Sequence, residues 1–251
     1  MAKLSVFMIV KNESQDLPRT LTAAQKVADE MVVVDSGSVD GTREVASAYA
    51  ANVFSRPFDN FSAQKTYALE HTSGDWALSL DADEVIPEAL AHEIRAKIES
   101  PGGEAGFTLK RRIFFLGREM RHGGLGNEKV VRLFKKGAGR YSGARIHECI
   151  LVDGPVGTLK HALLHYTNPT IRDYVRKSDF YTTLAAEEMF QGGRRFHLTD
   201  HLRPFWEFFQ RYVLKLGFLD GYEGFLWAAL SSHSAWIRQI KLRELQTKGK
   251  R

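Results

Sequence analysis

The chain has 251 residues, 43% of them hydrophobic and 26% charged, which is typical of a soluble globular protein with a sizeable core. Its single cysteine, Cys149, excludes an internal disulfide framework and a zinc site made of cysteines alone. The net charge of +5 resides in residues 236–251, so the rest of the chain is balanced and binding of nucleic acid is not expected.

The start of the chain and its apolar stretches indicate where the protein resides. Residues 1–6 lead directly into a strand-like run and lack the cleavage pattern of a signal peptide. No uninterrupted apolar stretch reaches the roughly 18 residues of a membrane span. We therefore expect a cytoplasmic protein, and the basic segment 236–251 leaves open a peripheral contact with the inner face of the cytoplasmic membrane.

The first hundred residues alternate between strand and helix patterns. Apolar runs typical of strands that are buried on both faces occur at residues 4–10, 31–34, 52–54 and 76–80. Helical patterns separate these runs at residues 16–27, 42–50 and 62–71. This alternation predicts an α/β fold with a mostly parallel sheet, which binds its ligands at the carboxyl ends of the strands.

The pattern changes after about residue 101. Residues 106–115, 129–135 and 156–164 are predicted to be strands with irregular connections, which favours a mixed or antiparallel extension of the sheet. From residue 171 the pattern is helical, with an apolar stripe at 205–216, a break at 217–221 and a helix at about 222–245. These helices are expected to pack on the domain or on each other, and docking on a membrane surface is the alternative.

Asp81 and Asp83 follow the fourth predicted strand, one residue apart. Side chains alternate along an extended segment, so the two carboxylates can reach the same point in space. A divalent cation would relieve their repulsion, and Mg²⁺ and Mn²⁺ often join carboxylates to substrate phosphates. The pair is therefore predicted to hold such an ion together with a diphosphate. A solvated turn or a helix start, favoured by Pro87, is the simpler alternative.

A second acidic loop follows the second predicted strand. Asp35 stands where that strand ends, and the small residues 36–38 allow a ligand to approach the backbone closely. Residues 11–13 end the first strand and would lie beside Asp35. The loop has neither the glycine pattern of a P-loop nor that of an NAD-binding turn, so a nucleotide would be bound here in another way.

These motifs resemble glycosyltransferase family 2. The likeness rests on Val-Lys-Asn-Glu at 10–13, Val-Asp-Ser-Gly-Ser-Val-Asp-Gly-Thr at 34–42, Gln-Lys at 64–65, Gly-Asp-Trp at 74–76 and Asp-Ala-Asp-Glu at 81–84. The resemblance implies a GT-A-type fold: a mostly parallel nucleotide-binding sheet flanked by helices, a mixed-strand acceptor region and a C-terminal helical extension. It also implies inverting transfer from nucleotide-activated sugars.

Later motifs are similar to the subgroup that contains lipopolysaccharide inner-core β-glucosyltransferases. They are Arg-Leu-Phe at 132–134, Ile-His-Glu at 146–148, His-Tyr at 165–166 and Gly-Phe-Leu-Asp-Gly at 217–221. The resemblance implies a catalytic domain over residues 1–168, with a nucleotide-binding half at 1–100 and an acceptor half at 101–168. Residues 169–251 would form the helical extension with its basic tail.

The resemblance also assigns roles to individual residues. Nucleotide-sugar contacts would come from Val10, Asn12, Glu13, Asp35, Lys65, Asp81 and Ala82. Mn²⁺ or Mg²⁺ would be the cofactor, with Asp81, Asp83 and His165 as ligands. For His165 a hydrogen-bonded structural role is the alternative, and Glu84 is expected to be a helix-start acid with only a supporting role.

The implied reaction needs a general base. In an inverting transfer the acceptor hydroxyl attacks opposite the departing diphosphate, and a carboxylate on the acceptor side can take its proton. Glu148 is the preferred candidate and Glu128 the second. The structural alternative for Glu148 is a salt bridge to Arg145 or Arg132.

The preferred function is metal-dependent transfer of a hexose, expected to be glucose, from a UDP-sugar to a lipid-linked or lipopolysaccharide-core glycan. An anionic membrane surface is a further expected partner of the C-terminal helices and basic tail. A sugar-nucleotide pyrophosphorylase is an alternative, but it would need a glycine-rich basic loop that residues 10–14 do not provide. A non-catalytic protein that binds nucleotide-sugars would keep the carboxylates and lack transfer.

Overall fold

The computed structural model describes residues 1–126, 128–143 and 149–248. The chain forms two compact units, the first made of residues 1–111 and 128–165 and the second of residues 112–127 and 166–251. Strands β6 (Gly106–Phe115) and β11 (Val156–Asn168) begin in the first unit and end in the second. The domain boundary that we expect at residue 168 stays a prediction.

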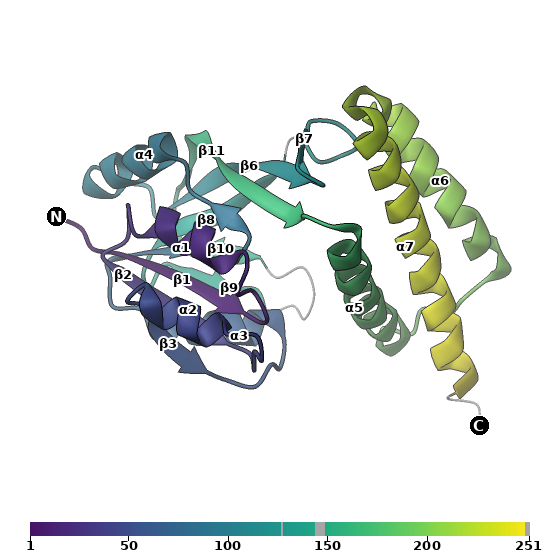
Figure 1. Ribbon diagram of the computed structural model, residues 1–251, viewed down its shortest axis with the longest axis horizontal. Coiled ribbons are helices and arrows are strands. Elements are labelled where there is room, and N and C mark those ends of the chain that lie inside the picture. Colours follow the sequence, from purple (N-terminus) through teal and green to yellow (C-terminus); the bar gives the residue numbers. More distant parts are fainter. Residues whose placement is uncertain (127, 144–148, 249–251) are drawn as a thin grey trace. The chain divides into compact units, whose positions relative to one another are not determined.

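The first unit is built on one sheet with the strand order β3–β2–β1–β4–β8–β6–β11–β5 (Figure 1). Its remaining strands are β1 (Leu4–Val10), β2 (Glu30–Asp35), β3 (Asn52–Ser55), β4 (Trp76–Ser79), β5 (Glu84–Val85) and β8 (Lys129–Lys135). Strands β1 to β4 are parallel, whereas β8 is antiparallel to β4 and β6, and β5 is antiparallel to β11. Strands β9 (Gly139–Tyr141) and β10 (Ile150–Val152) form a separate antiparallel pair.

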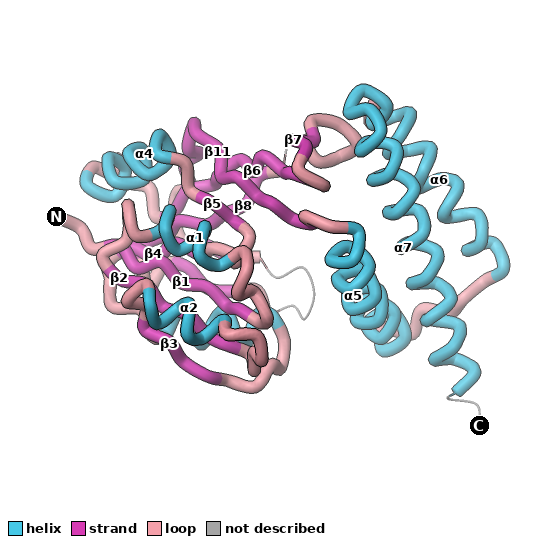
Figure 2. Tube along the Cα trace, viewed as in Figure 1, coloured by secondary structure: helices cyan, strands magenta, loops and turns pink. Residues whose placement is uncertain are grey.

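Three helices of the first unit connect the consecutive parallel strands β1 to β4, and a fourth connects β5 to β6 (Figure 2). They are α1 (Leu17–Ala24), α2 (Thr42–Ala48), α3 (Phe61–Glu70) and α4 (Glu88–Glu99). At the start of α3 the side chain of Asn60 accepts the N–H of Ala63 at 2.8 Å, which satisfies one of the free donors of the first turn. Pro87 directly precedes α4, so the predicted helix start is confirmed.

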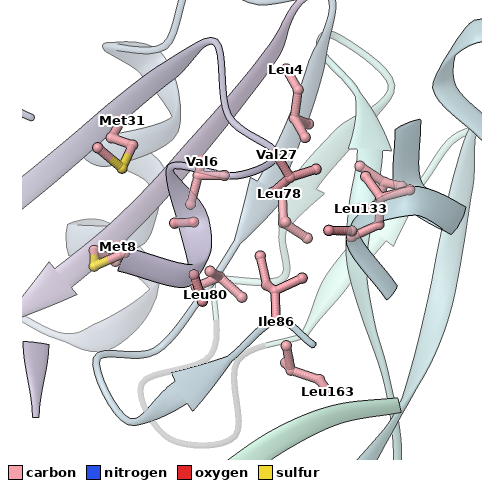
Figure 3. Close-up of a cluster of buried hydrophobic side chains, with 14 of the residues drawn as sticks. Leu4, Val6, Met8, Val27, Met31, Leu78, Leu80, Ile86, Leu133 and Leu163 are labelled. Atoms are coloured by element: carbon pink, nitrogen blue, oxygen red, sulfur yellow. The ribbon is translucent and has the colours of Figure 1, made fainter. Parts of the chain in front are cut away.

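The core of the first unit explains the continuous apolar run of the first strand. All residues of β1 are buried except Ile9, which is partly buried. Leu4, Val6 and Met8 belong to the larger hydrophobic cluster, which also holds Leu78, Leu80 and Leu133 (Figure 3). The alternate residue Phe7 belongs to a second cluster with Val32, Val34 and Phe134. Because side chains alternate along a strand, a strand covered on both faces is apolar at nearly every position, and the exception in β1 is the buried Ser5.

The second unit is mainly helical. It contains β7 (Arg118–Met120), α5 (Ile171–Gln191), α6 (Arg203–Phe209), a π-helical turn over Gln210–Leu214 and α7 (Gly221–Lys248). Helix α7 packs against both α5 and α6. A small core joins Phe115, Met120 and Tyr174 to Trp227. Within the described ranges, every helix is either too short or too polar to form a membrane span.

The predicted fold class is confirmed: parallel strands with flanking helices, a mixed extension of the sheet and C-terminal helices. One local expectation is wrong. Glu84 is not a helix-start acid, because it lies in β5 and pairs in register with His165 of β11. The short strands β5, β7, β9 and β10 were not predicted, since two or three residues carry no periodicity.

Candidate active site

The loops after β1 and β2 are joined at the carboxyl edge of the sheet. The carbonyl of Val10 accepts the N–H of Ser36 at 2.9 Å. Asn12 donates its N–H to Ser38 Oγ at 2.8 Å, and its Oδ1 accepts the N–H of Val39 at 2.9 Å. Its φ of 56° lies in the left-handed region, which asparagine tolerates better than most residues. The structure therefore places these two loops side by side, as the parallel sheet predicts.

Asp35 ends β2 with a carboxylate that closes its own loop. The residue is only 1% exposed, and its Oδ2 accepts the N–H groups of Gly37 and Ser38, each at 3.1 Å. Gly37 has a φ of 86°, which residues with a side chain rarely adopt. The carboxylate thus shapes the loop, and its contact with a nucleotide stays a prediction.

A second carboxylate, Asp40, ties the same loop to the segment after β1. It accepts the N–H of Ser14 at 3.1 Å and its hydroxyl at 2.9 Å, and Thr42 donates its hydroxyl at 2.5 Å. Desolvation opposes the charge, but the hydrogen bonds from Thr42 and Ser14 lower the pKa of Asp40 to about 2. Thr42 Oγ1 also accepts the N–H of Glu13 at 2.9 Å, which fixes the predicted position of Glu13 beside this loop.

Asp81 follows β4 and is held by two cations. Lys65 Nζ, from α3, lies 3.0 Å from Asp81 Oδ1, and Arg132 Nη2, from β8, lies 2.5 Å from Asp81 Oδ2. Burial opposes the charge, but Arg132 and Lys65 hold the pKa of Asp81 well below its usual range. The carboxylate is therefore ionised and fixed in direction. Lys65 is expected at the phosphates of a nucleotide, and here its ammonium contacts Asp81.

Glu84 supports Asp81 from the protein interior. Its Oε2 accepts the N–H of Asp81 at 2.9 Å, and its Oε1 lies 2.7 Å from Arg132 Nη2 and 3.1 Å from Arg111 Nη1. Glu84 is fully buried, so its charge requires such partners. We missed Arg111 and Arg132 as supports of the acidic cluster. The available signal was the position of Arg132 within the otherwise apolar core of β8.

Asp83 and His165 face each other because β5 pairs with β11. The register sets Glu84 opposite His165, and His165 Nε2 then lies 3.3 Å from Asp83 Oδ1. Burial would lower the pKa of His165, but the hydrogen bond and charge of Asp83 raise it above the ordinary value. The structure thus brings together two of the three predicted metal ligands, while Asp81 is directed to Lys65 and Arg132.

The donor set decides which kind of metal site these residues could form. In the described part of the chain, no three His, Cys, Asp or Glu side chains gather as a cage for an ion. Asp83 and His165 fit an ion that is shared with a substrate, because Mg²⁺ and Mn²⁺ complete their coordination with phosphates and water. The buried Nδ1 of His165 has no hydrogen-bond partner among the described residues, so its contact with Asp83 orients the ring.

The remaining predicted site residues have different surroundings. Ala82 is buried, and its carbonyl accepts the hydroxyl of Thr20 at 2.6 Å. Glu128 is partly exposed and its Oε1 lies 2.5 Å from Arg111 Nη2. Glu148 lies outside the described residues, as does Arg145, so the role of Glu148 stays a prediction.

Comparison with known proteins places the chain in a family. The model of "Glycosyl transferase family 2" matches residues 5–146. The lipopolysaccharide core biosynthesis glycosyltransferase LpsC of Rhizobium meliloti is 30% identical over 199 residues, which cover 76% of this chain and 73% of that protein. An uncharacterized glycosyltransferase of Rickettsia typhi is 26% identical over 262 residues, which cover 100% of this chain and 90% of the relative.

Solved structures are similar over a smaller part of the chain. Glucosyl-3-phosphoglycerate synthase from Mycobacterium tuberculosis, in complex with Mn²⁺, UDP and glucosyl-3-phosphoglycerate, is 24% identical with a TM-score of 0.38. The match covers 45% of this chain and 44% of that one, so the chain spans less than half the length of this structure. The family model covers more than half of the chain and LpsC matches most of it, and the chain therefore belongs to glycosyl transferase family 2.

Proposed function

We propose that this protein is a metal-dependent inverting glycosyltransferase that transfers a hexose, glucose in the first instance, from a UDP-sugar to a lipid-linked glycan of the lipopolysaccharide-core type. The observation that carries the proposal is the charge arrangement after β4. There Asp81 is fixed by Lys65 and Arg132, and Asp83 faces His165. The similarity to LpsC supports the class of acceptor.

In this proposal Asp83 and His165 would hold the ion at the place where the donor diphosphate binds. When bound, Mn²⁺ or Mg²⁺ would neutralise the negative charge that develops on the departing diphosphate. Asp81 remains ionised because of its two cationic neighbours, so it accepts hydrogen bonds from the donor. The loops of Val10, Asn12 and Asp35 bind the nucleotide through backbone and side-chain groups.

The acceptor hydroxyl must lose a proton as it attacks. Glu148 is the first candidate for the base, and Glu128 is the second. Because Oε1 of Glu128 is occupied by Arg111, proton transfer to Glu128 would fall to its Oε2. A single displacement inverts the anomeric carbon and needs no covalent intermediate, so no nucleophilic side chain is required.

Calorimetry with UDP tests the site directly. The native protein should bind UDP only with Mn²⁺ or Mg²⁺ present, and Asp83→Ala should abolish this metal-dependent binding. Asp153→Ala removes an exposed carboxylate that pairs with Arg140 in the same unit, so it serves as the matched control and should bind normally. Metal-independent binding of UDP by the native protein would contradict the proposed site.

Turnover separates the proposed enzyme from its alternatives. A screen of UDP-hexoses should give metal-dependent hydrolysis, or transfer when core-type glycans are added. Binding without either reaction would indicate a non-catalytic nucleotide-sugar-binding protein. Formation of a UDP-sugar from UTP and a sugar 1-phosphate would indicate a pyrophosphorylase. Glu148→Gln should keep donor binding and lose transfer, and retained turnover would move the base to Glu128 or another group.

A further inference from the structure

Helix α6 and the turns on either side of it expose a row of large apolar side chains in the second unit. We define the α6 surface by Leu202, Phe205, Trp206, Phe209, Val213 and Leu216, which are between 42% and 75% exposed. The spacing from Leu202 to Phe209 puts these four residues along one side of α6, while Val213 lies in the π-helical turn and Leu216 just beyond it. Neither α6 nor the π-helical turn after it contains a buried residue. Single exposed apolar residues are common, but a contiguous row marks an interaction surface.

The opposite side of α6 already has its packing partner. The rings of Phe208 and Tyr212 lie 5.9 and 5.8 Å from the ring of Phe225 in α7. The hydroxyl of Ser232, also in α7, donates to the carbonyl of Pro204 at 2.7 Å. The apolar stripe predicted over 205–216 therefore divides into an inner side that packs and an outer side that does not. Helix α6 is therefore already packed against α7 through its inner side, and the α6 surface is not needed to hold the helix in the unit.

The charge of the same region identifies the kind of partner. Residues 191–251 hold eleven basic and five acidic residues, whereas residues 1–190 hold 24 basic and 25 acidic ones. All five acids are engaged within the unit; they are Asp200, Glu207, Asp220, Glu223 and Glu244. The exposed Arg203 and Lys215 lie within the segment that carries the α6 surface. An apolar row in a strongly positive segment complements an anionic lipid surface.

We propose that the α6 surface docks the protein on an anionic phospholipid bilayer, with α6 lying in the plane of the interface. The aromatic and aliphatic side chains of the row enter the boundary between headgroups and acyl chains. Arg203 and Lys215 stay with the negatively charged headgroups. A second copy of the chain is a poorer occupant, because it would bring the same excess of positive charge against itself. This proposal does not rest on the proposed catalytic function.

Most of the basic C-terminal segment 236–251 belongs to a folded helix. Helix α7 continues to Lys248, and Gln239 and Leu242 within it are fully buried. Deletion of residues 236–251 would therefore remove part of the folded unit together with the charge. A test of membrane docking must change exposed side chains instead.

The test is flotation with vesicles of phosphatidylcholine, with and without phosphatidylglycerol. The native protein should float with the anionic vesicles, and salt should weaken this association. The variant Phe205→Ser/Trp206→Ser should lose roughly tenfold or more in partition, because two large apolar side chains no longer enter the lipid. The matched control Leu151→Ser/Val156→Ser changes two residues of the first unit that are 42% and 43% exposed, and it should float normally.

Thermal melting of each variant separates loss of folding from loss of docking, and Phe209→Ser provides a milder second variant of the same row. Equal flotation of the native protein and both α6 variants would overturn the proposal, as would failure of the native protein to float with anionic vesicles. Sedimentation equilibrium provides the third outcome. A native dimer that the double variant turns into a monomer would show that a second copy covers the surface, which also overturns lipid docking.

Discussion

At the scale of single residues, Glu84 connects the acidic loop to the interior of the first unit. Its carboxylate binds Arg132 and Arg111 and also the backbone N–H of Asp81, so it orients Asp81 through two routes. Arg132 touches both carboxylates and carries a raised pKa despite its burial, because Asp81 and Glu84 favour its charged form. Glu84 and Arg132 are therefore positioning residues for the proposed site.

Removal of the negative charge of Glu84 should destabilise the fold. Glu84→Gln leaves the buried Arg132 and the partly buried Arg111 without their common counter-charge, and we expect a loss of about 3 kcal/mol in the free energy of unfolding. Denaturant unfolding measures this loss. Asp153→Asn breaks an exposed ion pair with Arg140 and should leave the unfolding midpoint unchanged. Equal midpoints for Glu84→Gln and the native protein would mean that the buried network does not stabilise the fold.

The lowered pKa of Asp40 should make the stability of the fold depend on pH. Its pKa is about 2 in the folded protein against an ordinary value of 3.8, so its ionised form stabilises the fold above about pH 4. This contribution is lost as the pH falls toward 2, because both states then bind the proton. At neutral pH, Asp40→Asn should cost about 1 kcal/mol, a value reduced for solvent exposure. The difference between variant and native protein should shrink in unfolding curves below pH 4, and a constant difference would contradict this assignment.

At the scale of the elements, the periodic segments were predictable and the pairings were not. Residues 106–115 and 129–135 were predicted as strands with the bounds that the structure has, because long apolar runs carry a clear signal. The adjacency of the loops after β1 and β2 could be predicted from the parallel strand order. The contact of Asp81 with Arg132 could not be predicted, because β8 is more than forty residues further along the chain and its register depends on packing. The pairing of β5 with β11 is likewise distant in the sequence, so Glu84 was wrongly expected at a helix start.

Helix α3 carries Lys65, which contacts Asp81. A change that disorders the first turn of α3 should therefore weaken the proposed nucleotide site. Asn60 caps the helix through the N–H of Ala63, and Asn60→Ala should lower the free energy of unfolding by about 1 kcal/mol. The first turn would fray next to the buried Lys65, so metal-dependent UDP affinity should fall as well. Asn60→Asp retains an acceptor for the N–H and should restore both quantities. Failure of this restoration would mean that the cap is not what orders α3.

At the scale of the whole molecule, the two proposals fall on different units of the chain. Every described residue of the proposed nucleotide site belongs to the first unit, and the α6 surface belongs to the second. A ligand that binds only the folded state stabilises the region that it contacts, by about 2.7 kcal/mol at a hundredfold excess over its Kd. Amide hydrogen exchange can resolve where that protection arises.

We therefore predict two separate patterns of protection. UDP with Mn²⁺ should slow exchange in the loops at 10–14, 35–42 and 81–84, because backbone and side-chain groups there bind the nucleotide. Anionic vesicles should slow exchange in 202–216, where the apolar row leaves water. Asp83→Ala should remove only the first pattern, and Phe205→Ser/Trp206→Ser only the second. Protection of α6 by UDP and Mn²⁺ alone would contradict this separation, because no residue of the proposed nucleotide site lies in that unit.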